Sequence, residues 1–326
     1  MKEAVRLSHR IRLLLDALGR RNPGGKALVG QQGWLYLIND TNSFLHYQFG
    51  VERWTEGDIR LAGEVLAERS RLIEELGGRY LKLIQPERST LYPDHLPEPL
   101  CRLSLYEPRP AQHITRLLPV QAAYPLEFFR TWKPRGHLFF HGDTHVNWLG
   151  SYVGYLATLE LLAANGFASP VAPVLLSELD PKLVSYGGDL FDQLDADQKA
   201  QLSASMQGNM PRWGVEDLIS YELPENMRDY TSRGDDGTYA AYNERALIVT
   251  EKADARLPRA VIFRGSSLAL IQPLLSRHFS RAVYVWHKNL PYRDILERER
   301  PDVVLHCITE RFVWDTGIKN PLYARP

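Results

Sequence analysis

Three polar side chains recur at alternate positions in the segment FFHGDTHVNWLG, residues 139–150. They are His141, Asp143 and His145, and they follow an apolar run, HLFFH, that predicts a strand. Alternate side chains of an extended strand point to the same face, so all three are expected to converge. Three interpretations stay open: part of a catalytic triad, a set of metal ligands, or a polar strand end with Asp143 capping the next helix.

A second segment, VIFRGSSLAL at 261–270, places two serines where a predicted buried strand turns into a helix. A serine at such a turn lies at the carboxyl edge of the sheet, where open α/β folds bind ligands. Free N–H groups at the helix start can stabilise a developing oxyanion. Taken alone, Ser266 is better explained as an N-cap, but the separate Asp-x-His segment completes a Ser, His and Asp set.

The composition of the 326-residue chain is that of an ordinary globular protein, with 44% hydrophobic and 24% charged residues. Lys+Arg and Asp+Glu both number 39, so net charge does not indicate binding to nucleic acid or to an anionic membrane. The two cysteines, Cys101 and Cys307, provide neither a disulfide framework nor a CxxC metal site. Cys307 lies in the apolar stretch DVVLHCI and is expected to be a buried thiol.

Strand and helix patterns alternate at short spacing in the last third of the chain. RAVIFRG, RAVYVWH and DVVLHCI predict strands, as RYLKLIQP does earlier, and the segments between the last three predict helices. This alternation predicts an α/β fold with a doubly wound, mostly parallel sheet. The breaker cluster RRNPGGKA predicts a division into an N-terminal amphipathic helix or tail, residues 1–25, and a single catalytic domain, residues 26–326.

The N-terminal segment is basic and amphipathic, and its longest apolar run, LLL, is too short for a signal sequence or a membrane span. The chain as given is therefore expected to be cytoplasmic, or periplasmic if an export signal has been removed. A helix that lies on a membrane surface is one interpretation of this segment, which is the only part of the chain that offers membrane association. A helix that docks on the main domain is the favoured interpretation.

Several motifs occur in an order that resembles the alginate O-acetyltransferase family of AlgJ/AlgX type. They are GWLYLIND, QPERSTLYPDHLP, DTH at 143–145, GGDL, RGSSLAL and RPDVVLHCITER, and together they extend over residues 28–315. In this family the Asp-x-His sequence precedes the serine, and the order here agrees. The chain has Gly-Ser-Ser-Leu where the family has Gly-Asp-Ser-Phe, and Trp148 comes three residues after the histidine rather than directly after it.

The resemblance implies an SGNH-hydrolase-like three-layer α/β/α fold and a sugar or polysaccharide O-acetyltransferase or O-acetylesterase with a Ser-His-Asp triad. It gives the nucleophile role to Ser267, the base role to His145 and the orienting role to Asp143. No metal or other cofactor is expected. The groups expected to form the oxyanion hole or to bind substrate are Gly265, Ser266, Leu268, Arg264, Trp148 and Tyr152.

The implied partners are an acyl donor and a glycan acceptor, with other polysaccharide-biosynthesis proteins and without nucleic acid. One alternative is a non-catalytic glycan-binding protein of exopolysaccharide biosynthesis on the same fold. The altered serine motif favours it, and the intact Asp-Thr-His sequence argues against it. The other alternative is a metal-dependent hydrolase using His141, Asp143 and His145, although no further residue completes a known metal motif.

Overall fold

The computed structural model of the chain describes residues 2–20, 25–184, 188–205, 215–234, 247–286, 291–313 and 320–323. A seven-stranded sheet lies at its centre. In spatial order its strands are β4 (Ala122–Ala123), β3 (Arg79–Gln85), β11 (Val303–Thr309), β9 (Arg259–Arg264), β10 (Arg281–Trp286), β8 (Ile248–Glu251) and β7 (Thr231–Gly234). The strands from β4 to β10 are parallel, and β8 and β7 continue the sheet in antiparallel pairing.

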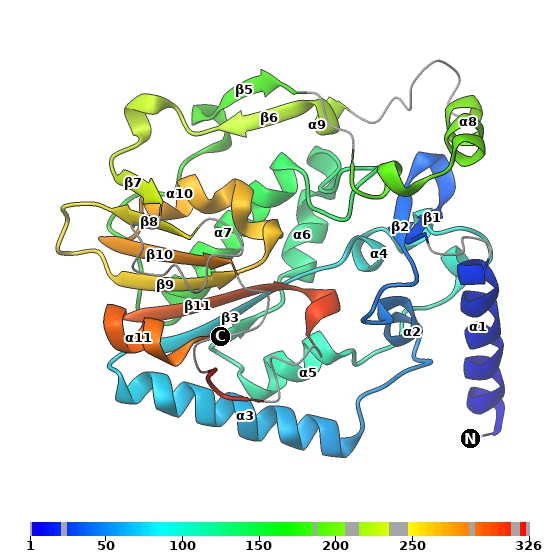
Figure 1. Cartoon of the computed structure of the whole chain (residues 1–326), viewed down its shortest axis with the longest axis horizontal. Coiled ribbons are helices and arrows are strands. Elements are labelled where there is room, and N and C mark those ends of the chain that lie inside the picture. The colour runs from blue at the N-terminus through cyan, green and yellow to red at the C-terminus, as the bar shows by residue number, and fades with distance from the viewer. Residues whose placement is uncertain are drawn as a thin grey trace.

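Two small antiparallel sheets and a set of helices complete the fold (Figure 1). The small sheets pair β1 (Ala27–Val29) with β2 (Leu35–Leu37), and β5 (Asp180–Leu183) with β6 (Ile219–Glu222). The α-helices are α1 (Lys2–Arg20), α2 (Phe44–Gln48), α3 (Glu56–Glu75), α4 (Arg88–Leu91), α5 (Pro110–Leu117), α6 (Leu126–Trp132), α7 (Trp148–Ala164), α8 (Ala196–Ser205), α9 (Val215–Leu218), α10 (Gln272–Ser276) and α11 (Arg293–Glu299).

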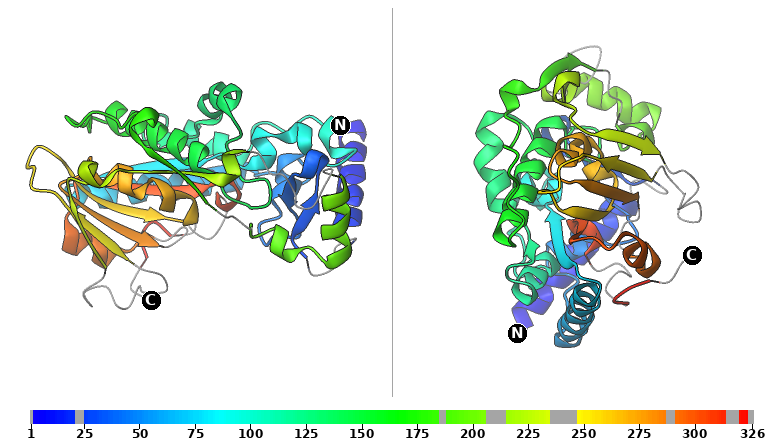
Figure 2. Two further views of the ribbon diagram at one scale, coloured as in Figure 1. Left: turned by 90° about the horizontal axis from the view of Figure 1, so that it is seen from above. Right: turned by 90° about the vertical axis from the view of Figure 1, so that its left-hand side faces the viewer.

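Residues of the central strands alternate between two apolar layers. On β9, Val261 and Phe263 belong to a core cluster that includes residues of α3, α5 and α11. Ala260 and Ile262 of the same strand belong to a second cluster, which includes residues of α7 and α10. The sheet therefore lies between two helical layers, and in the view from above in Figure 2 α7 lies over one face of it. The predicted doubly wound, mostly parallel α/β sheet is confirmed.

The two long helices next to the sheet begin at capping side chains. Thr55 and Asp58 form a capping box at the start of α3. At the start of α7, the Asn147 side-chain oxygen accepts a hydrogen bond from Gly150 N at 2.9 Å. The interpretation of Asp143 as the cap of this helix is therefore wrong, because Asn147 fills that position.

The N-terminal helix α1 packs on the rest of the protein. Ile11 and Leu15 are 7% and 2% exposed and join a third apolar cluster that includes Trp34 of the segment before β2. None of the described helices is long and apolar enough to cross a bilayer. The division at residue 25 and the cytoplasmic location stay predictions.

Candidate active site

The two serines follow β9 at the carboxyl edge of the central sheet. β9 is buried from Ala260 onward, and Gly265 continues it in an extended conformation (φ −94°, ψ −168°). A 3₁₀ helix, Ser266–Ile271, comes next and is followed by the short helix α10. The sequence predicted a single longer helix here. Pro273, in the first turn of α10, has no N–H for a bond to the preceding turn, which explains the division.

Asp143 and His145 lie in a tight turn rather than in a strand. Phe139 and Val146 form an isolated antiparallel bridge across this turn, and Phe140 N donates to His145 O at 3.3 Å. The strand predicted for HLFFH is therefore wrong beyond that single bridge. Because the chain reverses direction here, His141 does not share a face with Asp143 and His145.

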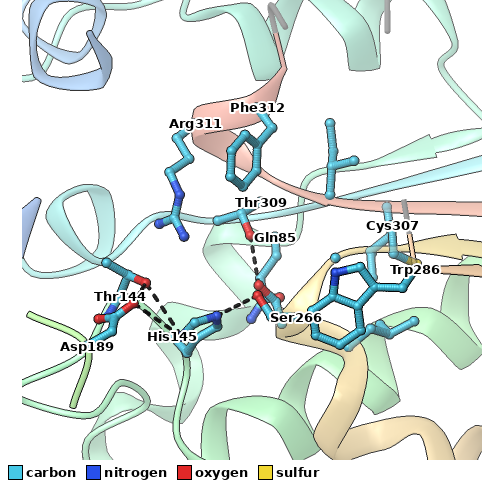
Figure 3. Close-up of a pocket in the computed structure, with 15 residues that line it drawn as sticks. Gln85, Thr144, His145, Asp189, Ser266, Trp286, Cys307, Thr309, Arg311 and Phe312 are labelled. Atoms are coloured by element: carbon cyan, nitrogen blue, oxygen red, sulfur yellow. Dashed lines mark hydrogen bonds and ion pairs between the residues drawn. The ribbon is translucent and has the colours of Figure 1, made fainter. Parts of the chain in front are cut away.

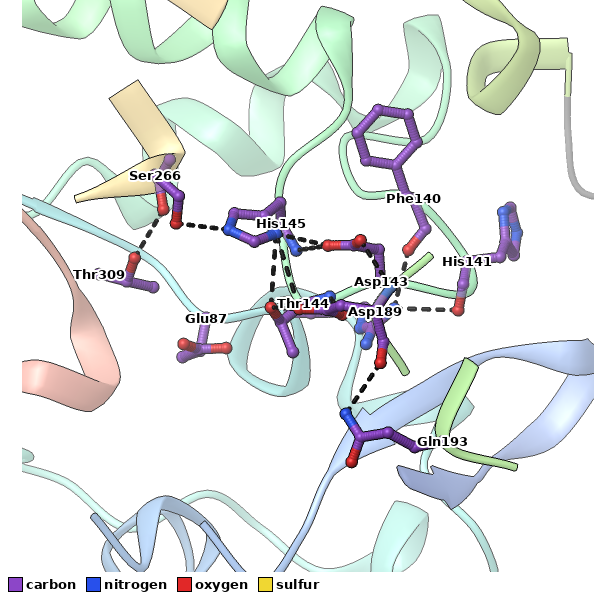
Figure 4. A network of polar contacts seen from close by, with 12 residues as sticks. Glu87, Phe140, His141, Asp143, Thr144, His145, Asp189, Gln193, Ser266 and Thr309 are labelled. Atoms are coloured by element: carbon purple, nitrogen blue, oxygen red, sulfur yellow. Dashed lines mark hydrogen bonds and ion pairs between the residues drawn. The ribbon is translucent and has the colours of Figure 1, made fainter. Parts of the chain in front are cut away.

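Ser266, His145 and Asp143 form a continuous chain of hydrogen bonds (Figure 4). His145 Nε2 lies 2.5 Å from Ser266 Oγ, and His145 Nδ1 lies 2.5 Å from Asp143 Oδ1. An ionised carboxylate only accepts hydrogen bonds, so Nδ1 carries the proton of a neutral ring and Nε2 accepts from the serine hydroxyl. His145 N also donates to Asp143 Oδ1 at 2.8 Å, which fixes the backbone of the turn on the same carboxylate.

Ser267 makes a different contact. Its Oγ lies 2.8 Å from Thr309 Oγ1, at the end of β11. The prediction that Ser267 faces His145 is therefore wrong by one position. In a 3₁₀ turn successive side chains project about 120° apart, so only one of two adjacent serines can point at the histidine.

Asp189, which lies outside the Asp-Thr-His turn in the sequence, forms hydrogen bonds with two residues of that turn. Its backbone N donates to Asp143 Oδ2 at 2.8 Å, and its carboxylate accepts from Thr144 N at 2.7 Å and Thr144 Oγ1 at 2.6 Å. The preceding Gly188 has φ +95°, and a Cβ there would lie 2.3 Å from Gly142 O, so glycine is required. The motif GGDL contains this residue, but spacing alone gave Asp189 no role. The first glycine of the motif lies outside the described residues.

Asp143, His145 and Asp189 are the three groups whose potential metal-ligating atoms lie within 4.8 Å of one another among the described residues. His141 is not one of them. Its Nδ1 lies 2.8 Å from Asp217 Oδ2, and its ring points away from the turn (Figure 4). The structure thus contradicts the predicted set of His141, Asp143 and His145. The oxygens of Asp143 and Asp189 already accept N–H and O–H donors, which favours an orienting role over a ligand role.

Ser266 and His145 open into a cavity of about 210 Å³ (Figure 3). Gly265 and Leu268 of the serine turn also line it. The remaining walls combine polar and apolar side chains and are formed by Leu83, Gln85, Thr144, Asp189, Ser267, Trp286, Cys307, Ile308, Thr309, Arg311 and Phe312. Burial raises the pKa of the Cys307 thiol, so this residue is expected to stay protonated.

Gln85 is a lining residue that the sequence analysis did not single out. It ends β3 and is paired in register with Thr309 of β11, so it lies at the same sheet edge as the serine turn. The residue is 9% exposed, and no hydrogen bond to another described residue occupies its side-chain amide. Its amide N–H is thus available to a bound molecule in the cavity (Figure 3). A polar residue at the carboxyl end of a buried strand was the signal that could have identified it.

Two arginines support the cavity in different ways. Arg311 lines it, and its Nη1 lies 2.6 Å from Glu87 Oε1 in a buried ion pair. Arg264 lies behind the wall: its Nη1 donates to Gly265 O at 3.2 Å, and its guanidinium carbon is 4.5 Å from the ring centroid of Trp286. Burial lowers the pKa of Arg264 to about 10. The prediction that Arg264 contacts the substrate is therefore wrong, because its guanidinium group lies behind the cavity wall and supports it.

The two predicted aromatic residues are placed differently. Trp148 lines a smaller pocket next to Ser266. Tyr152 is 5% exposed, lies in the core cluster under α7, and donates its hydroxyl hydrogen bond to Val174 O at 3.0 Å. The prediction that Tyr152 binds substrate is therefore wrong, since its side chain is part of the core.

No family model and no curated protein sequence matches the chain. Among solved structures, it resembles PatB1 of Bacillus cereus with a sulfonyl adduct, at 14% identity and a TM-score of 0.62 over 90% of this chain and 97% of that one. It also resembles the O-acetyltransferase domain of Pseudomonas putida AlgJ, at 15% identity and a TM-score of 0.55 over 90% and 93%. A DHHW family protein from Eubacterium siraeum matches at 15% identity and a TM-score of 0.56 over 91% and 99%. The SGNH-hydrolase-like three-layer α/β/α fold is thereby confirmed.

Proposed function

We propose that this chain is a serine-dependent O-acyltransferase or esterase that acts on acylated sugars. Ser266 is the nucleophile, His145 is the general acid and base, and Asp143 orients His145. The hydrogen-bond chain from Ser266 through His145 to Asp143, open to a cavity at the sheet edge, carries the proposal. The fold shared with the O-acetyltransferase domain of AlgJ supports the class of reaction.

In the first half-reaction the acyl group moves from its donor to the enzyme. Ser266 Oγ forms a bond to the acyl carbon while its proton passes to His145 Nε2. The tetrahedral intermediate then collapses, the bond to the donor oxygen breaks, and that oxygen takes the proton from His145. Asp143 stabilises the positive ring that exists between the two proton transfers.

The second half-reaction repeats these steps in reverse with a new acceptor. A hydroxyl group gives its proton to His145 and attacks the acyl carbon, and Ser266 leaves and regains a proton. A sugar hydroxyl as acceptor makes the enzyme a transferase, whereas water makes it an esterase. The cavity walls suit a sugar acceptor, because Trp286 and Phe312 offer aromatic faces and Thr309 and Arg311 offer polar groups.

The developing oxyanion needs donors close to Ser266. The first N–H groups of a helical turn have no partner within that turn, so the N–H of Ser266 is one donor. The side-chain amide of Gln85 is the second donor that we assign, since it lines the cavity without a competing hydrogen bond among the described residues.

Active-site labelling with an aryl sulfonyl fluoride tests the proposal. Wild-type protein should lose hydrolysis of an aryl acetate as one sulfonyl group attaches to the peptide that contains Ser266. Ser266→Ala should lower kcat/KM about a thousandfold or more and abolish labelling. Ser267→Ala is the matched control and should keep most of both.

Two results contradict the proposal in different ways. If Ser267→Ala is inactive and Ser266→Ala is active, the nucleophile is the wrong serine. If folded wild-type protein is neither labelled nor active on acetyl esters but binds oligosaccharides, the chain is a glycan-binding protein rather than an enzyme.

A further inference from the structure

A second, smaller pocket meets Ser266 from another side. It measures about 130 Å³, and besides Ser266, Ser267 and His145 its walls are Phe140, Val146, Trp148, Ala269 and Leu270. Those five side chains present carbon atoms almost exclusively. We call this space the side pocket and the 210 Å³ cavity the main cavity. The two share Ser266, Ser267 and His145, so a molecule bonded to Ser266 can reach both.

The two spaces differ in chemistry. The main cavity has the polar groups Gln85, Thr309 and Arg311 in its walls, whereas the side pocket has only the buried indole N–H of Trp148 beyond the shared catalytic segment. An ester centred on Ser266 has a polar part, the sugar, and an apolar part, the acyl chain. Polar groups that lose water without gaining a partner are costly to bury, so the sugar is excluded from the side pocket and the acyl chain is favoured there.

The size of the side pocket sets the length of that chain. A closed apolar cavity of about 150 Å³ accommodates a benzene molecule, so a pocket of similar volume has room for several carbon atoms. At about 130 Å³ the side pocket has more room than the methyl group of an acetyl ester fills. We propose that the side pocket is the acyl-binding site and that it accepts acyl chains longer than acetyl, with butanoyl a better fit than acetyl.

This inference rests on the proposed function and specifies its acyl donor. The transfer itself is unchanged: the butanoyl carbonyl carbon bonds to Ser266 Oγ, the serine proton passes to His145, and the donor oxygen leaves with that proton. Each methylene that enters the side pocket should raise kcat/KM about three- to fivefold, given the free energy of burying one CH₂. The gain should stop once the chain is longer than the pocket.

The test is a series of p-nitrophenyl esters from acetate to octanoate, each corrected for its uncatalysed hydrolysis. Full-length wild-type protein should prefer butanoate over acetate by about tenfold, which corresponds to two methylenes. Ala269→Leu places a larger side chain in the partly exposed wall of the side pocket and should lower the butanoate-to-acetate ratio at least tenfold. Leu270→Ala widens the same wall and should move the optimum toward hexanoate.

Phe312→Leu is the matched control, because Phe312 lines only the main cavity of the two. It should change kcat/KM for all esters together and leave the butanoate-to-acetate ratio as it is. The rate at which alkyl sulfonyl fluorides of increasing chain length label Ser266 gives a second readout that needs no turnover. The butyl reagent should label Ser266 faster than the methyl reagent, as butanoate esters should react faster than acetate esters.

The inference is wrong if the wild-type protein prefers acetate and if neither Ala269→Leu nor Leu270→Ala changes the butanoate-to-acetate ratio of kcat/KM. Turnover that depends on Ser266 would still support the proposed function in that case. Failure of the proposed function looks different, because neither esters nor sulfonyl fluorides then react at Ser266. Thermal unfolding of each variant should match that of the wild type, which separates a change in fit from a loss of fold.

Discussion

The serine turn, Gly265–Leu268, and the Asp-Thr-His turn, residues 143–145, meet at one point but are supported differently. The serine turn continues β9, which has paired strands on both sides in the middle of the sheet. The Asp-Thr-His turn contains no strand longer than a single bridge. Its conformation depends on hydrogen bonds between side chains and backbone, in which Asp189 and Asp143 are the acceptors.

This difference separates the two halves of the site energetically. Displacing Ser266 requires distortion of buried, paired strands, which are part of the cooperative core. Displacing His145 requires only the loss of a few local hydrogen bonds, each worth about 1 kcal/mol, and somewhat more where a carboxylate accepts. Substitutions on the serine side should therefore act through the chemistry of individual groups, whereas substitutions around the Asp-Thr-His turn should act through geometry.

Outside the triad of Ser266, His145 and Asp143, the largest effect is expected at Gln85, on the strand-supported side. Gln85→Ala removes a proposed oxyanion donor and should lower kcat about a hundredfold or more. KM should change little, because the hydrogen bond from the Gln85 amide to the oxyanion forms in the transition state. Steady-state kinetics on acetate and butanoate esters measure this. Gln85→Glu, which offers an acceptor in place of the amide donor, should be at least as impaired. A loss confined to KM would assign Gln85 to sugar binding instead.

A smaller effect is expected at Asp189, which lines the main cavity but whose carboxylate is bound to the Asp-Thr-His turn. Asp189→Ala removes both acceptors for Thr144 and should lower kcat about ten- to thirtyfold, since two hydrogen bonds of about 1 kcal/mol each are lost. Asp189→Asn keeps one acceptor oxygen and should recover part of the activity. Labelling of Ser266 by a sulfonyl fluoride should slow in parallel with kcat. Full activity of Asp189→Ala would show that Asp143 alone holds the turn.

The smallest effect on activity is expected at His278, where a substitution should instead change the stability of the protein. His278 connects α7 and α10, the helices that follow the two turns. His278 Nε2 lies 2.8 Å from the hydroxyl of Tyr155 on α7, and His278 follows α10. Burial, with Arg277 and Lys252 nearby, lowers the pKa of His278 to about 4. The unfolded chain has the ordinary histidine pKa of about 6.5 and binds the proton more readily, so acid favours unfolding.

The free energy of unfolding should therefore fall as the pH is lowered from about 6.5 toward 4, by up to about 3 kcal/mol from this group. Urea unfolding at pH 7.5 and pH 4.5 measures the change. His278→Gln cannot titrate and still reaches Tyr155, so its stability should depend less on pH over this interval. Equal pH dependence in both proteins would mean that the pKa of His278 is the same in the folded and the unfolded state.

Local sequence patterns determined the parts of the fold that could be predicted. β3, β9, β10 and β11 lie where continuous apolar runs predicted strands, because strands with helices on both faces need apolar side chains on both. The start of α3 is determined just as locally, because its capping box consists of Thr55 and Asp58, which are three positions apart. The apolar run HLFFH also predicted a strand, and this prediction was wrong because its apolar residues are buried around a turn.

The candidate site was predictable where neighbouring residues make it. Asp143 and His145 lie together as their spacing indicated, although in a turn instead of a strand. The choice between Ser266 and Ser267 depends on the rotation of a single turn, which no motif encodes. Gln85 and Asp189 come to the site through tertiary contacts with distant segments, so their roles needed the three-dimensional arrangement.

The position of β11 has a consequence for the synthesis of the protein. Among the strands of the described residues it comes last in the sequence, yet it lies between β3 and β9 and pairs with both. Before Val303–Thr309 leaves the ribosome, β3 and β9 have no direct neighbour in common, and each presents an unpaired apolar edge. Until β11 is inserted, the free edges of β3 and β9 can pair with other chains, so aggregation competes with folding during this interval.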